Sequence, residues 1–122
     1  MKTTFLATLL LILGLGTGGE SITIVVTHST ATVGVASASA LAAVASGAKA
    51  RIHIYLENDS DTVIYCRFGA TATLNTGIRL AAAGTIGNRI VFTPVTGVPQ
   101  VVLNCIASGA SKTLLIATGI GN

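Results

Sequence analysis

The chain has 122 residues, of which 51% are hydrophobic and only 9% are charged. This length corresponds to one domain of ordinary size, and a chain so apolar and so poor in charge is not intrinsically disordered. The formal net charge of +3 comes from cations scattered between Lys2 and Lys112, and only 4% of the residues are aromatic, so the basic stripe and the stacking aromatics of a nucleic-acid-binding protein are missing. Because globular chains carry about 25% charged residues, we expect much of this surface to be covered by partners.

Residues 1–19 form an apolar N-terminal segment, with one cation, an apolar run from Phe5 to Leu15 and small residues at its end. This pattern is typical of a secretory signal peptide. As a helix the run extends less than about 20 Å, which is too short for a hydrocarbon core of about 30 Å. Two interpretations stay open: the segment is removed on export, or it is retained as an arm buried against its own domain or a partner.

From Glu20 onward, hydrophobic and polar residues alternate with period two, which predicts a strand. Residues 38–45 are rich in Ala, and a helix is a weak expectation there, because Ser and Val interrupt the run and Gly47 follows it.

The clearest unit spans residues 49–68. Residues 51–57 and 62–68 both alternate, and between them lies the segment Asn58 to Asp61, whose residue types bond their own backbone in turns. This pattern predicts two antiparallel strands joined as a hairpin.

Short strands separated by Gly, Pro, Asn and Ser are predicted at 77–80, 89–92, 101–106 and 113–118. Strands at such short intervals indicate a sandwich or barrel. We therefore predict an all-β fold, a single β-sandwich or jelly-roll-like domain over residues 20–122, preceded by the apolar segment 1–19. The residues expected in or near its core are Ile52, Ile54, Leu56, Ile64, Cys66, Phe68, Ile90, Phe92, Leu103 and Leu115.

The two cysteines, Cys66 and Cys105, are expected to point inward, because they alternate with apolar residues. In an exported chain they would be able to form a disulfide, and in a reducing compartment they would be small core side chains. The unbonded state is the favoured interpretation. Their spacing is not that of a zinc or redox motif.

No constellation of residues points to catalysis. His28 and His53 are the two histidines, and the carboxylates in residues 57–61 lack the spacing of a calcium loop. The Gly-containing stretch 83–88 lacks the ending of a phosphate-binding loop, and no GxSxG motif occurs. We expect no catalytic, cofactor-binding or metal-binding residues, no small-molecule substrate and no enzyme activity.

The four arginines lie in predicted strands on polar faces. They would either form ion pairs across a subunit contact or be solvated. They are Arg51, Arg67, Arg79 and Arg89.

The string from Arg51 to Tyr65, RIHIYLENDSDTVIY, followed by Phe68-Gly69 and by TGIRLAAAG over residues 76–84, resembles small structural proteins of tailed bacteriophage virions. A final strand after Ala107-Ser108-Gly109 adds to the similarity, which covers about residues 21–118. The shared motifs are strand and turn patterns without a catalytic signature. The resemblance implies a compact β domain that decorates, cements or forms fibres on a particle.

We therefore expect a virion structural protein, a capsid decoration, cement or fibre-like subunit on the virion surface. Its partners would be further copies of itself, with a trimer as one arrangement, and other virion proteins such as the major capsid protein. The alternative is a secreted or periplasmic adhesin or pilus-like subunit, with residues 1–19 cleaved and Cys66 bonded to Cys105. A ligand-binding barrel ranks third, since it would need inward polar groups, and an enzyme ranks last. The interface candidates are Phe5, Leu9, Leu11, Leu13, Leu15, Arg51, His53, Tyr55, Arg67 and Arg79.

Overall fold

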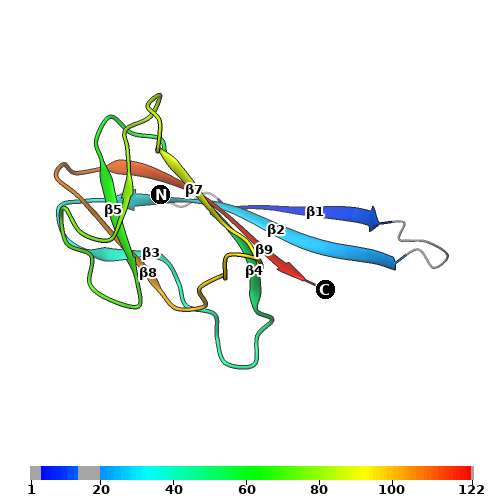
Figure 1. Cartoon of the computed structure of the whole chain (residues 1–122). Coiled ribbons are helices and arrows are strands. Elements are labelled where there is room, and N and C mark those ends of the chain that lie inside the picture. The colour runs from blue at the N-terminus through cyan, green and yellow to red at the C-terminus, as the bar shows by residue number, and fades with distance from the viewer. Residues whose placement is uncertain (1–3, 14–19, 122) are drawn as a thin grey trace.

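The chain forms β-strands joined by turns and loops, as the computed structural model in Figure 1 shows. The structure describes residues 4–13 and 20–121, with side chains described from residue 24 onward. The strands are β1 (Thr4–Leu13), β2 (Glu20–Val33), β3 (Ala38–Leu41), β4 (Arg51–Asn58), β5 (Ile64–Phe68), β6 (Ile78–Leu80), β7 (Arg89–Phe92), β8 (Leu103–Ala107) and β9 (Lys112–Gly121).

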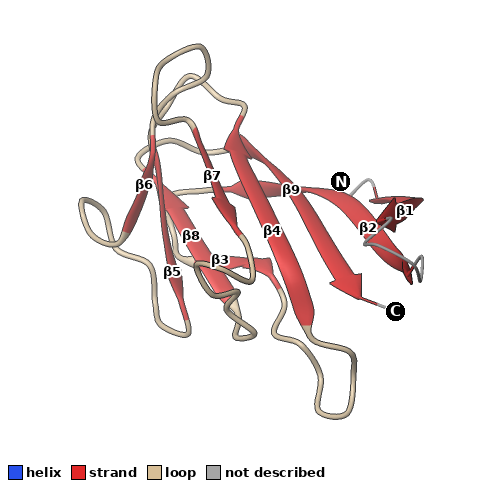
Figure 2. Ribbon diagram, turned by 45° about the vertical axis from the view of Figure 1, so that its right-hand side comes forward, coloured by secondary structure: helices blue, strands red, loops and turns tan. Residues whose placement is uncertain are grey.

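Two antiparallel sheets pack face to face (Figure 2). The order is β2-β9-β4-β7 in one sheet and β3-β8-β5-β6 in the other, and β1 is added to the first sheet beside β2. The prediction of an all-β sandwich is confirmed.

The strands from β2 to β9 pair like one long hairpin that has been rolled up. β2 pairs with β9, β3 with β8, β4 with β7 and β5 with β6, all antiparallel. Rolling this hairpin places β4 beside β9 and β5 beside β8, which completes the two sheets. Most successive strands therefore lie in opposite sheets.

This arrangement contradicts the predicted hairpin of residues 51–68. β4 pairs with β9 and β7, whereas β5 pairs with β8 and β6. The turn itself forms as its residue types indicate: the Asn58 side-chain oxygen accepts hydrogen bonds from the Ser60 backbone N–H at 3.0 Å and the Ser60 hydroxyl at 2.6 Å. The Asn58 amide donates to the carbonyl of Leu80 at 3.1 Å. The turn at Asn58 reverses the chain direction as predicted, but the strand that follows it joins the other sheet.

The weak expectation of a helix over residues 38–45 is also wrong. Ala38–Leu41 forms β3 and pairs with β8. Pairing with a neighbouring strand outweighs the small intrinsic helix preference of Ala.

The core lies between the inner faces of the two sheets. Of the predicted core residues, Ile54, Leu56, Ile64, Cys66 and Leu103 are fully buried, and Phe68, Ile90 and Phe92 pack against them. The rings of Phe68 and Phe92 meet edge to face with centroids 5.4 Å apart, which joins β5 of one sheet to β7 of the other.

Two core predictions are wrong. Leu115 is half-buried, while its neighbours Leu114 and Ile116 are fully buried, so β9 has the opposite phase from the one expected. Residues 113–117 contain four consecutive apolar residues, and alternation along such a run does not reveal which of them face inward. Ile52 is half-buried and lies outside the core cluster, where the pairing of β4 with β9 shifts register between Arg51 and His53.

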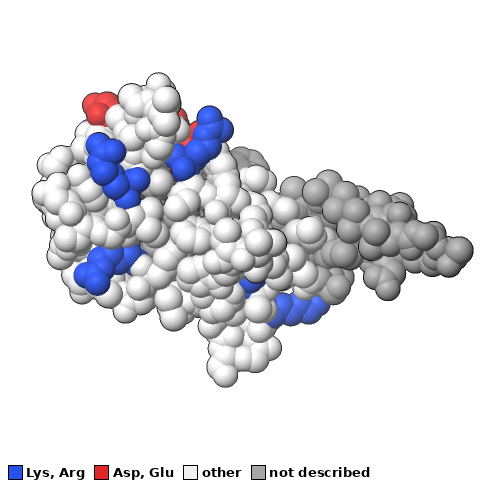
Figure 3. Space-filling model, viewed as in Figure 1, with Lys and Arg blue, Asp and Glu red and all other residues white. Residues whose placement is uncertain are grey.

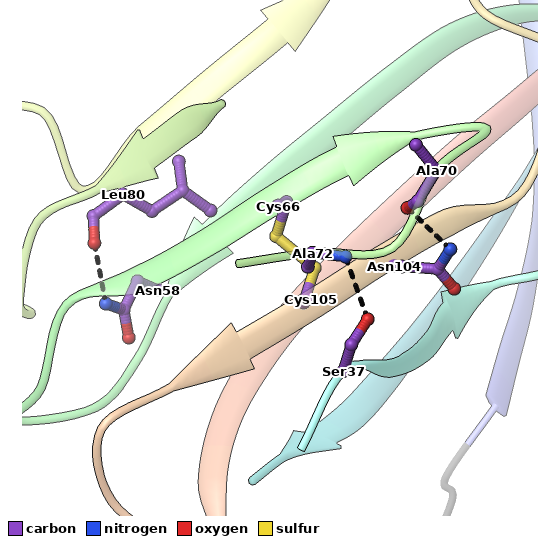
Figure 4. Close-up of a disulfide and its surroundings, with 8 residues drawn as sticks. All are labelled: Ser37, Asn58, Cys66, Ala70, Ala72, Leu80, Asn104 and Cys105. Carbon is purple, nitrogen blue, oxygen red and sulfur yellow. Dashed lines mark hydrogen bonds between the residues drawn. A yellow bond between two sulfur atoms is a disulfide. The ribbon is translucent and has the colours of Figure 1, made fainter. Parts of the chain in front are cut away.

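Cys66 and Cys105 lie directly opposite each other on β5 and β8, with their Cα atoms 4.1 Å apart, and form a disulfide (Figure 4). Both are buried, as expected for inward-facing positions. The favoured interpretation of two unbonded thiols is wrong. Because β5 and β8 are neighbours in one sheet and both cysteines point to its inner face, their sulfur atoms lie within bonding distance.

Arg51, at the start of β4, is buried at 6% exposure. Its guanidinium donates hydrogen bonds to the carbonyls of Ala42 at 2.8 Å, Pro99 at 2.9 and 3.2 Å, and Val101 at 2.9 Å. The Gln100 side chain bonds both the N–H and the carbonyl of Arg51, at 2.8 and 2.9 Å. Burial lowers the pKa of the Arg51 guanidinium below its ordinary value. Arg51 is therefore neither solvated nor a surface interface residue; it ties the loops before β4 and before β8 together.

Replacing the disulfide by two alanines, Cys66→Ala with Cys105→Ala, should lower the free energy of unfolding by about 3–4 kcal/mol. The bond joins residues 39 apart in sequence, and closing a loop of this length removes conformational entropy from the unfolded chain. Urea unfolding of both proteins measures the difference. Equal urea midpoints would show that the bond adds nothing to stability.

Arg51→Met should lower the free energy of unfolding by about 2–4 kcal/mol, because the carbonyl groups of Ala42, Pro99 and Val101 lose their donor. The matched control is Arg79→Met on β6, an exposed arginine, for which we expect a change within about 0.5 kcal/mol. Urea midpoints of the two variants compare the effects, and equal losses would contradict the role assigned to Arg51.

Candidate interaction surface

The outer side of the sheet β2-β9-β4-β7 is the candidate functional surface. Its residues alternate with the buried ones along each strand, since successive strand residues point to opposite sides. We call it the β9 face, and define it by Ile24, Val26, His28, Thr30, His53, Tyr55, Glu57, Arg89, Val91, Leu115, Ala117 and Gly119.

A hollow of about 330 Å³ lies on the β9 face above Ala117. Ala117 is directly opposite His28 on β2 and Tyr55 on β4. Leu115, Thr30 and Glu57 lie one step further along the same three strands and also line the hollow. A methyl group in the central strand, between two longer side chains on the neighbouring strands, leaves this space open.

A second hollow of about 360 Å³ lies above Gly119, the next outward-facing residue along β9, which has no side chain to fill the space. Gly119 is opposite Val26 and His53, and Ile24, Ile52 and Pro94 complete the lining. A Cβ atom at Gly119 would lie 3.3 Å from both the Ile24 Cγ2 and the His53 Cβ. Small residues along β9 thus produce a row of two largely apolar hollows.

Charge is sparse on the β9 face. Glu57 on β4 and Arg89 on β7 are its charged residues, and they lie directly opposite each other. Figure 3 shows the molecule from the side of Figure 1, with Lys and Arg in separate positions and most of the described surface uncharged. The face therefore suits contact with an apolar, nearly neutral partner rather than with a polyanion.

The structure separates the predicted interface residues. His53 and Tyr55 lie on the β9 face. Arg67 and Arg79 lie on the outer side of the other sheet, on β5 and β6. There Arg67 donates to the carbonyl of Thr71 at 3.4 Å.

The other predicted interface residues lie elsewhere. Arg51 is buried inside the sandwich. The side chains of the N-terminal candidates and the whole of Leu15 lie outside the described residues; on the backbone, β1 pairs with residues 20–29 of β2. The N-terminal candidates are Phe5, Leu9, Leu11, Leu13 and Leu15.

Sequence reasoning missed the floor of both hollows. Ala117 forms the floor of the first hollow, with Leu115 beside it, and Gly119 forms the floor of the second. The signal was present, because the small residues in the last strand occupy every second position, 117, 119 and 121. Interpreting that signal requires knowing that β9 is a central strand with a neighbour on each side.

Residues 24–121, whose side chains the structure describes, contain no group of three His, Cys, Asp or Glu that could hold a metal ion. The described residues also contain no helix long and apolar enough to cross a membrane.

Comparison with protein-family models, with curated proteins and with solved structures gives no match for this chain.

Gly119→Ala should lower the free energy of unfolding by about 1 kcal/mol, because Ile24 and His53 must shift to admit the methyl group. The control is Gly34→Ala, where a Cβ meets no atom within 4 Å and a small stabilisation of about 0.5 kcal/mol is expected from the stiffer unfolded chain. Thermal unfolding of both variants tests this. A Gly119 variant as stable as the Gly34 variant would mean that Gly119 is not confined by its neighbours.

Proposed function

We propose that this protein is a non-enzymatic structural subunit of a virion, a capsid decoration, cement or fibre-like protein that acts through protein–protein contacts. The observation that carries the proposal is the β9 face, an apolar sheet surface with two hollows of side-chain size and almost no charge. Apolar patches rimmed by polar residues are typical of interaction sites.

The strand order supports the same proposal. Eight strands paired as a rolled hairpin, β2-β9-β4-β7 over β3-β8-β5-β6, are arranged as in a jelly roll. Jelly rolls are frequent in viral capsid proteins, and they also occur in lectins and cupins. Because one fold serves many functions, the surface carries more weight here than the fold.

The disulfide favours a second candidate, a secreted or periplasmic adhesin or pilus-like subunit. Disulfides persist in oxidising compartments and are rare in the cytosol, although they also occur on virion surfaces. With Cys66 and Cys105 bonded in the core, cleavage of residues 1–19 on export would fit the composition of that segment. The two candidates differ in where the mature chain is found and where it begins.

Gradient-purified particles from the native source test the first candidate. We expect an antibody raised against residues 24–121 to detect the protein in the particle band, at a constant ratio to the major capsid protein across gradient fractions. The control is a host periplasmic protein, which should be absent from that band. Detection only in the periplasm or medium, free of particles, would overturn the virion proposal and support the adhesin.

Intact-mass spectrometry of the native protein tests the retention of residues 1–19. In a virion subunit we expect the full segment, because its apolar side chains would each gain about 1.5–3 kcal/mol on burial against a neighbour. A chain that begins at or near Glu20 would contradict the arm and support export. The same spectrum, recorded with and without reductant, reports the two protons that distinguish bonded from free cysteines.

A further inference from the structure

We propose that the β9 face packs against the β9 face of a second copy of this chain about a two-fold axis. This inference rests on the proposed function and names the first partner of the subunit. The outer side of the other sheet, β3-β8-β5-β6, then stays available for contacts with other proteins.

The shape of the face supports a second copy. A two-fold contact uses the same patch on both subunits, so one patch must supply both projections and the hollows that receive them. The β9 face has both: its hollows lie above Ala117 and Gly119, and Tyr55 and Leu115 border the hollow above Ala117. Val91, directly opposite Tyr55 on β7, adds an apolar side chain that is 43% exposed.

The charges of the face are also self-complementary. Glu57 and Arg89 are neighbours of opposite sign, and a two-fold contact can bring Glu57 of one copy near Arg89 of the other. A nucleic acid or an anionic membrane would require several cations, and Arg89 is the cation of this face. Opposite charges at the rim would orient the two copies.

The outer side of the second sheet differs in chemistry. Arg67 and Arg79 lie on it, together with Tyr65, whose hydroxyl bonds Asn75 at 3.0 Å. This more polar and basic side fits a contact of another kind, which is why we assign self-association to the β9 face.

A matched pair of substitutions tests the assignment. Leu115 and Ile106 are both half-buried, and they lie in the inner strands β9 and β8 on opposite outer sides of the sandwich. Leu115→Arg should raise the dissociation constant for self-association at least about 10-fold, because it places an unpaired charge in an apolar part of the contact. Ile106→Arg should leave it within about 2-fold. Sedimentation equilibrium of the full chain measures both, with circular dichroism and urea midpoints confirming that each variant is folded.

A charge exchange provides a second test that leaves the apolar side chains of the face unchanged. Glu57→Arg should weaken association, and adding Arg89→Glu in the same chain should restore it toward the wild-type value. If the double variant associates as weakly as Glu57→Arg alone, the two-fold pairing of these residues is overturned.

Equal loss of association in the Leu115 and Ile106 variants would place the contact elsewhere, and would overturn this inference while leaving the structural role intact. A wild-type protein that stays monomeric at every attainable concentration would overturn self-association through this face. Binding to the particle, tested separately on gradient-purified virions, would still decide the proposed function.

Discussion

The position of β9 between β2 and β4 is the constraint on which the rest of the structure depends. Its inward residues, Leu114 and Ile116, close the core from one side. Its outward residues, Ala117 and Gly119, form the floor of both hollows. Because strand residues alternate between the two sides of a sheet, stability and surface shape are set by interleaved positions of one strand. A shift of one residue in its register would exchange these roles and place small residues in the core.

Arg51 is one of the few charged residues of the sandwich, and its buried side chain holds two loops together. A buried guanidinium without a carboxylate partner is costly, and here four hydrogen bonds to three carbonyl groups offset the cost. Those carbonyls belong to loops outside the strands, so the side chain adds to the backbone hydrogen bond from Val44 N–H to the Gln100 carbonyl that already joins the two loops. The buried polar residues of the described chain, Arg51 and Asn58, lie at the two ends of β4, and the middle of the core stays apolar.

The fold class and the placement of most strands could be predicted from alternation and turn residues, whereas strand partners could not. The Asn58 turn has the chemistry of a hairpin, yet β4 and β5 belong to different sheets, because local residues determine a chain reversal and long-range packing determines the partner. The interface candidates Tyr55 and His53 lie on the outer side of the sheet, where the clear alternation of their strand puts them. The burial of Arg51 could not be predicted, because it depends on carbonyl groups up to 50 residues away in the sequence. The outward orientation of Leu115 could not be predicted either, because every residue in the run 114–117 is apolar and alternation does not show which of them face the core.

The rolled pairing also has a consequence for the order of events in the cell. Because β2 finds its sandwich partner in β9, the last strand of the chain, the first sheet cannot form while residues 112–121 are still being synthesised. Pairing between such distant segments makes folding slow, since a long loop must close before the contact stabilises it. The surface that we assign to self-association is built from both of these strands. A nascent chain without residues 112–121 therefore lacks this surface, and the first sheet must be complete before two copies can associate through it.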